Sequence, residues 1–77
     1  MTLKVDYQTS DLYFAAYLIS LGQVVKGVSG EDRRKVFLFD ITPVIDKAKS
    51  DWMDGRAMVD ASKYSRCVAT CKRMLYL

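Results

Sequence analysis

The chain has 77 residues, with twelve Lys and Arg against nine Asp and Glu, and a formal net charge of +3. This length allows one domain and leaves no room for a second core. The positive charge excludes mimicry of nucleic acid by an acidic surface, which needs a large negative field, and it favours anionic partners. Because the sequence holds two cysteines and no histidine, it also excludes a structural zinc site built from Cys and His.

Residues 9–22 predict the first helix, because polar Thr9, Ser10 and Asp11 precede an apolar run and Gly22 follows it. Such a helix needs cover on more than one side, since apolar residues fill all its faces. Two explanations stay open: one monomeric core with tyrosine hydroxyls at a wet edge, or a homodimer that supplies the missing cover. The apolar faces hold Leu12, Ala15, Ala16 and Ile19 as one stripe, and Tyr13, Phe14, Tyr17, Leu18 and Leu21 around it.

The same helix is too short to cross a membrane, because its apolar part spans about ten residues where a span needs about 20. The polar start of the chain, residues 1–9, does not resemble a signal peptide. We therefore expect a cytoplasmic protein without a membrane partner.

Residues 23–28 and 35–41 predict a β-hairpin, since both are rich in β-branched and aromatic residues and turn-forming residues separate them. Gly30 is free to take a positive φ in the connection. The second strand alternates Val36 and Leu38 with Phe37 and Phe39, so one face is strongly apolar and the other nearly so. We expect both faces to meet protein.

A second helix is predicted after Thr42, with Thr42 as N-cap, Pro43 at the first helical position and Gly55 beyond its end. Its apolar face holds Ile45, Ala48 and Trp52. The short run at 56–59 predicts a third strand that pairs with the hairpin edge.

The last helix is predicted over 61–76, with Asp60 as its cap. The expected fold class is α+β: a small antiparallel sheet packed with three helices, in the order α-β-β-α-(β)-α, as one domain over residues 1–77. The core-facing stripe holds Tyr64, Cys67, Val68, Cys71 and Leu75, and the opposite surface carries Lys63, Arg66, Thr70 and Arg73 with Lys72 beside them.

The two cysteines, Cys67 and Cys71, lie four residues apart and face the same side of this helix. A disulfide between them would strain the helix, so we expect two reduced, buried thiols. The predicted core is Leu12, Ala16, Ile19, Phe37, Phe39, Val68 and Cys71.

Three segments together resemble a known family: TSDLYFAAYL at 9–18, DGRAMVDASKY at 54–64 after the hairpin, and the basic ending CKRMLY at 71–76. In their order and spacing they are similar to an uncharacterised family of small bacterial and phage proteins, classed as a domain of unknown function. The resemblance covers nearly the whole chain. It implies a bacterial or phage cytoplasmic setting and brings no activity with it.

No enzyme is expected, because nucleophilic catalysis usually relies on a histidine base and the chain has none. The carboxylates of Asp51, Asp54 and Asp60 lack the alternation of a calcium loop. Residues 27–30 lack the lysine of a phosphate-binding loop. No cofactor or metal is predicted.

The basic residues are the remaining candidate site, since they can follow a phosphate backbone. We expect a non-enzymatic, phage-type accessory protein that binds a macromolecule, nucleic acid first. The first alternative is a protein-interaction module, or an inhibitor of a host factor, that uses Tyr13, Tyr17 and Trp52. The second is an oligomer that holds a small ligand between subunits. The expected nucleic-acid-binding residues are Arg33, Arg34 and Lys35 at the hairpin end and Lys63, Arg66 and Arg73 on the last helix.

Overall fold

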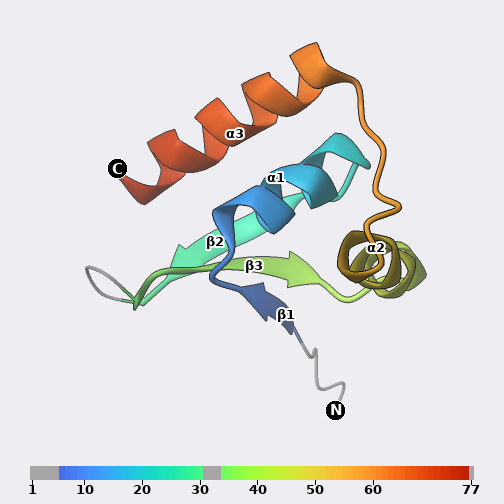
Figure 1. The fold of residues 1–77 in the computed structure, drawn as a ribbon. Coiled ribbons are helices and arrows are strands. Elements are labelled where there is room, and N and C mark those ends of the chain that lie inside the picture. The colour runs from blue at the N-terminus through green and yellow to red at the C-terminus, as the bar shows by residue number, and fades with distance from the viewer. Residues whose placement is uncertain (1–5, 31–33, 77) are drawn as a thin grey trace.

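Three helices and a three-stranded antiparallel sheet make up the protein (Figure 1). The computed structural model describes residues 6–30 and 34–76. The α+β fold class is confirmed. In chain order the elements are β1 (Asp6–Thr9), α1 (Leu12–Ser20), β2 (Val25–Ser29), β3 (Val36–Asp40), α2 (Pro43–Met53) and α3 (Ala61–Leu75).

The sheet has β3 at its centre, with β1 and β2 antiparallel on either side. The hairpin of β2 and β3 lies where the sequence predicts it. The prediction of the third strand is wrong: residues 56–59 form no strand, and the third strand is β1. β1 pairs with the edge of β3 that β2 leaves open, with Tyr7 opposite Phe39 and Thr9 opposite Phe37.

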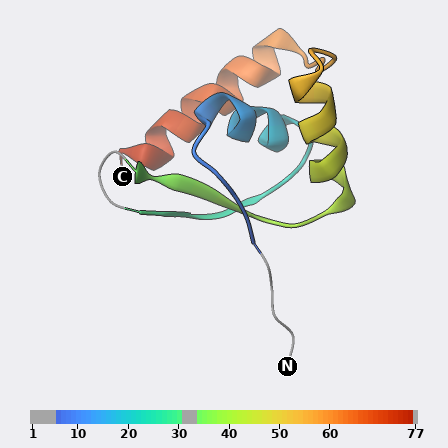
Figure 2. The ribbon, with the colours of Figure 1, turned by 60° about the horizontal axis from the view of Figure 1, so that its bottom comes forward.

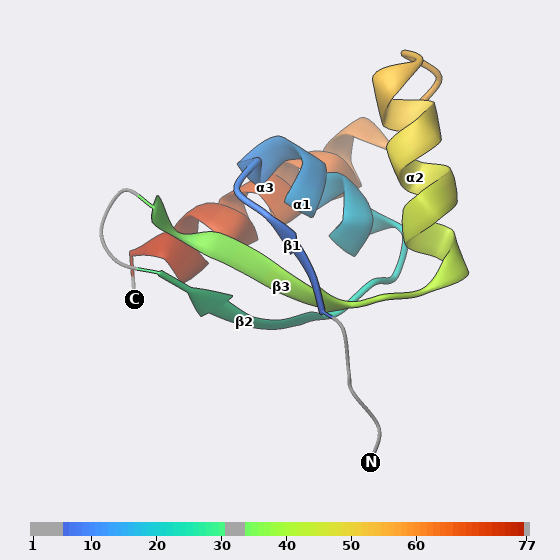
Figure 3. The same cartoon turned by 90° about the horizontal axis from the view of Figure 1, so that it is seen from below.

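Helices α1 and α3 lie on one face of the sheet, with α1 between the sheet and α3 (Figures 1 and 2). Seen from below, β1 and β3 pass in front of α1 and α3, and α2 stands at the end of the sheet (Figure 3). This layering explains the all-round apolar character of α1. Its buried residues are Phe14, Ala15, Ala16, Tyr17, Leu18 and Ser20.

Cover for α1 therefore comes from its own chain, and a homodimer is not required to explain it. The homodimer stays a prediction. Of the predicted core, Ala16, Phe37, Phe39 and Cys71 are buried. The other three, Leu12, Ile19 and Val68, are only partly buried and pack against the core from its edge.

Helix ends follow the predicted caps. Asp11 Oδ1 accepts hydrogen bonds from the backbone N–H of Tyr13 at 2.9 Å and of Phe14 at 3.2 Å. Asp60 Oδ2 accepts one from the N–H of Lys63 at 2.9 Å. These side chains satisfy backbone donors that the first helical turn leaves without partners.

Thr42 occupies the N-cap position of α2, but its hydroxyl makes no capping hydrogen bond. It lies 2.9 Å from Gln23 Oε1 instead and donates to it, which ties the start of α2 to the segment before β2. Gly30 has the expected positive φ, at +99°.

The outer face of the sheet differs from the sequence expectation. Phe37 and Phe39 point into the core, while Leu38 between them is half-buried on the other face, over which no described helix lies. On that outer face Lys26 Nζ lies 2.7 Å from Asp6 Oδ1 and 3.1 Å from Asp40 Oδ1. These two hydrogen bonds raise the pKa of Lys26.

Candidate functional site

The strongest concentration of positive charge in the described chain lies on α3. From Ala61 to Tyr76 the chain carries four cations and no carboxylate. The four cations, Lys63, Arg66, Lys72 and Arg73, are all exposed. We call Lys63, Arg66 and Arg73, which share one arc of the helix, together with Arg34, the basic surface.

A hydrogen bond joins the hairpin to the end of α3. Lys35 Nζ donates to the backbone carbonyl oxygen of Leu75 at 2.6 Å. The end of β2 and the start of β3 therefore lie near the last turn of α3 (Figures 2 and 3). Lys35 satisfies a carbonyl at the helix end, so its ammonium has a structural role.

The hairpin and α3 cations are thus partly brought together. Arg34 is exposed next to Lys35, and Arg73 lies in the last turn of α3. Lys63 stands ten residues before Arg73, about 15 Å along the helix axis. Arg33, the remaining predicted binding residue, lies outside the described residues.

The α3 cations are not neutralised within the described part of the chain. In that part, Lys26 pairs with Asp6 and Asp40. Arg56 pairs with Asp51 of α2 and with Asp54, the C-cap residue of that helix. No ion pair between described residues includes a cation of α3. Part of the charge has a local reason, because Lys72 and Arg73 in the last turn favour the negative end of the helix dipole.

An aromatic side chain that the sequence analysis missed lies at the same end. Tyr76, the C-cap residue of α3, is 86% exposed. Its backbone N–H donates to the Arg73 carbonyl oxygen at 3.2 Å, so the aromatic residue and this cation belong to the same turn. Tyr76 follows the predicted core stripe of α3, and nothing in its spacing separates it from core residues such as Leu75.

The three aromatic residues predicted for protein interaction have different surroundings. Tyr13 is 54% exposed. Trp52 is half-buried and packs on Tyr17, with ring centroids 5.4 Å apart. Tyr17 itself is 4% exposed, so it has little surface to offer a partner.

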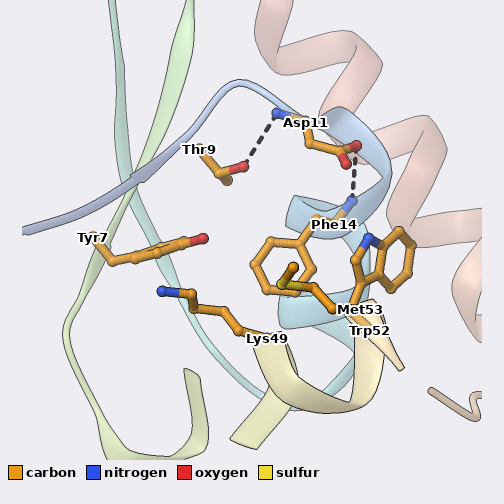
Figure 4. Close-up of a pocket in the computed structure, with 7 residues that line it drawn as sticks. All are labelled: Tyr7, Thr9, Asp11, Phe14, Lys49, Trp52 and Met53. Carbon is orange, nitrogen blue, oxygen red and sulfur yellow. Dashed lines mark hydrogen bonds between the residues drawn. The ribbon is translucent and has the colours of Figure 1, made fainter. Parts of the chain in front are cut away.

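Trp52 also forms part of an open pocket of about 190 Å³ within a single chain. Three segments meet there: β1 and the residues after it, α1, and the last turns of α2 (Figure 4). Sequence reasoning identified only Trp52, because residues so far apart in the chain give no local signal. The lining residues are Tyr7, Thr9, Asp11, Phe14, Lys49, Trp52 and Met53.

Polar groups enter this pocket from three sides. Lys49 Nζ lies 5.4 Å from the centroid of the Tyr7 ring, a cation–π distance. Thr9 Oγ1 accepts a hydrogen bond from the N–H of Asp11 at 3.1 Å. Burial, helped by the charge of Asp11, raises the pKa of the Tyr7 hydroxyl, while a hydrogen bond with Thr9 opposes that shift.

A family model for a domain of unknown function, DUF5659, matches residues 4–77. The chain belongs to the DUF5659 family. Comparison with curated proteins and with solved structures found no match. Family membership therefore assigns no chemistry to this chain, because the family is a domain of unknown function.

The cysteines of this DUF5659 domain are free and buried, as predicted. Burial, with a smaller contribution from Cys67, raises the pKa of the Cys71 thiol to about 11. A thiol protonated at neutral pH is a poor nucleophile. Among the described residues no cluster of Cys, Asp and Glu can hold a metal ion, and no helix is long and apolar enough to cross a membrane.

Proposed function

We propose that this DUF5659 domain is a non-enzymatic accessory protein, of bacterial or phage origin and cytoplasmic, that binds nucleic acid through the basic surface. The observation that carries the proposal is the concentration of exposed cations on α3 without a carboxylate in the same segment. Phosphate contacts supply most of the sequence-independent affinity of nucleic-acid-binding proteins.

The proximity of the hairpin end supports this proposal. Because Lys35 binds the Leu75 carbonyl, exposed Arg34 belongs to the same end of the molecule as Arg73. Three to four cations spread over about 15 Å of helix axis match the phosphates of about four consecutive base pairs, which rise 3.4 Å each.

Tyr76 gives the surface a means of distinguishing single strands from duplexes. Tyr76 is 86% exposed, in the same turn as Arg73. Unpaired bases stack on exposed aromatic rings with about 1–3 kcal/mol per base, whereas bases in a duplex already stack on each other. We therefore expect single strands to bind more tightly than duplexes of the same length, with little preference for sequence.

Fluorescence anisotropy with labelled oligonucleotides tests the proposal. The double variant Arg66→Glu, Arg73→Glu reverses two charges of the basic surface and should abolish measurable binding at low salt. The matched control is Lys47→Glu, Arg56→Glu, which changes net charge equally on exposed positions of α2 and of the segment after it. It should retain most of the affinity if the location of the charge, and not only the total, is responsible.

Equal losses in both double variants would reduce the effect to net charge and contradict a defined surface. A parent protein that binds no oligonucleotide at low salt would refute the function itself. Tyr76→Ala should weaken binding to single strands by about 1–3 kcal/mol and leave duplex binding unchanged.

A protein-interaction module is the second candidate, and a different observation favours it. Met53 and Met58, at the end of α2 and in the segment after it, are 83% and 86% exposed. Flexible, polarizable methionines are common on surfaces that bind protein partners. Binding of a protein partner that Met58→Ser abolishes, in a domain that holds no nucleic acid, would favour this alternative.

A further inference from the structure

The pocket beside α2 is a second candidate site, separate from the basic surface, because the two share no residue. Its walls are apolar: Phe14 from α1 and Trp52 and Met53 from α2. The two charged groups, Asp11 and Lys49, lie on opposite sides of these walls in Figure 4. The pocket thus offers flat aromatic surface between an acceptor and a cation.

The size of the pocket limits what it can hold. Pockets for drug-sized ligands usually measure about 300–1,000 Å³. This one measures about 190 Å³ and is open to solvent. It therefore suits one flat ring system, with the rest of the ligand at the mouth.

Asp11 has an oxygen available for a ligand. Its Oδ1 already accepts two backbone hydrogen bonds that cap α1. Its Oδ2 accepts none from the described residues. A ligand with an N–H donor can therefore bind Oδ2 without disturbing the helix cap.

Lys49 gives the opposite side of the pocket a preference for anions. Its ammonium lies over the Tyr7 ring and forms no ion pair with a described carboxylate. Because this ammonium already covers the Tyr7 ring, a cationic ligand in the pocket would meet a like charge. An anionic group on the ligand would meet a donor instead.

We propose that the pocket binds a nucleoside monophosphate whose base carries an amino group. The base packs on Trp52 and Met53, its amino group donates to Asp11 Oδ2, and its phosphate binds Lys49 at the mouth. The same chemistry is present in a free mononucleotide and in one unpaired nucleotide of a strand. The inference does not depend on the basic surface.

Trp52 provides the measurement, because it is the single tryptophan of the chain and gives one indole N–H signal in a ¹H–¹⁵N spectrum. Titration with AMP should shift this signal in a saturable way. Adenosine, which lacks the phosphate, should bind roughly tenfold more weakly, the factor that about 1.4 kcal/mol represents. The monophosphate of purine riboside, which has the same ring system without the amino group or any other N–H donor, should also bind more weakly.

Two variants assign the ends of the ligand. Lys49→Met should remove the difference between AMP and adenosine, while Lys47→Met, on the same helix and outside the pocket, should keep it. Asp11→Asn should reduce the preference for AMP over the monophosphate of purine riboside. Asparagine caps helices as well as aspartate does, so this variant keeps α1 intact, and the remaining signals of the spectrum verify the fold.

The source of the nucleotide follows from a second titration with an oligodeoxyadenylate. If AMP binds more tightly per site than the oligonucleotide, the ligand is a free mononucleotide. If the oligonucleotide binds more tightly than AMP to the Arg66→Glu, Arg73→Glu variant, the pocket holds a nucleotide of a strand. No shift of the indole signal at millimolar AMP, or a shift unchanged in both Lys49→Met and Asp11→Asn, would overturn the inference. Either failure leaves binding at the basic surface unaffected, so the two proposals are separable.

Discussion

The inward face of β3 can be tested by truncating Phe39. This side chain is fully buried at the centre of the sheet, opposite Tyr7 on one side and Val25 on the other. Truncation of a buried Phe to Ala costs about 3–5 kcal/mol. A domain of this size has a net stability of roughly 3–5 kcal/mol, so Phe39→Ala should be largely unfolded at 25 °C.

The neighbouring residue supplies the control. Leu38 lies on the same strand but on the outer face, half-exposed, so Leu38→Ala should cost no more than about 1–2 kcal/mol. Phe39→Leu keeps most of the buried volume and should cost a similar amount, which keeps the comparison measurable if Phe39→Ala does not fold.

Urea unfolding followed by far-UV circular dichroism gives all three free energies of unfolding. The expected order of destabilisation is Phe39→Ala first, with Leu38→Ala and Phe39→Leu well below it. A larger loss for Leu38→Ala than for Phe39→Ala would mean that the strand faces are reversed and would refute the sheet described here.

Three further predictions concern local structure. The thiols of Cys67 and Cys71 should react with iodoacetamide only after unfolding, and the intact mass should show no disulfide. Because folding raises the pKa of Cys71 from 9.0 to about 11, the thiol ionises first in the unfolded chain. The free energy of unfolding should therefore fall as the pH rises between these values, and it should fall less in Cys71→Ala. Gly30→Ala should cost more than about 1 kcal/mol in urea unfolding, because φ is +99° and the new Cβ would clash with the backbone oxygen of Arg34. Gly27→Ala meets open space, so equal costs for the two variants would contradict the turn. Asp60→Ala should lower stability by about 1 kcal/mol and Asp60→Asn by much less, and equal losses would argue against the cap.

Local signals in the sequence predicted the helix ends and the hairpin. Asp11 and Asp60 cap the helices where their side chains meet backbone donors a few residues away, and Gly30 turns where only glycine is unstrained. Such features depend on residues close in the chain. For this reason the number of helices and most of their bounds could be predicted.

Features that depend on residues far apart in the chain could not be predicted from the sequence. The sequence of β1, DYQT, has no apolar alternation, and it becomes a strand because β3 offers a free edge to it. In α1 the apolar residues cover every face, so periodicity could not distinguish buried Tyr17 from exposed Tyr13. Only the folded chain shows which neighbours surround each ring.

The candidate sites show the same division. The cations of α3 were visible in the sequence because their spacing places them on one arc. The contact between α3 and the hairpin depends on Lys35 and Leu75, which are 40 residues apart. The pocket joins three segments, so no single stretch of sequence indicated Asp11 and Lys49 as its charged groups.

The dependence of nucleic-acid affinity on salt tests the central claim most directly. If the basic surface neutralises three to four phosphates, log K for a duplex should fall against log salt with a slope near −3, and Arg66→Ala, Arg73→Ala should reduce that slope by about 2. Binding to the parent protein with this slope, and its reduction in the double variant, is the result expected. A slope that the double variant leaves unchanged would contradict the assignment of the basic surface as the site of nucleic-acid binding.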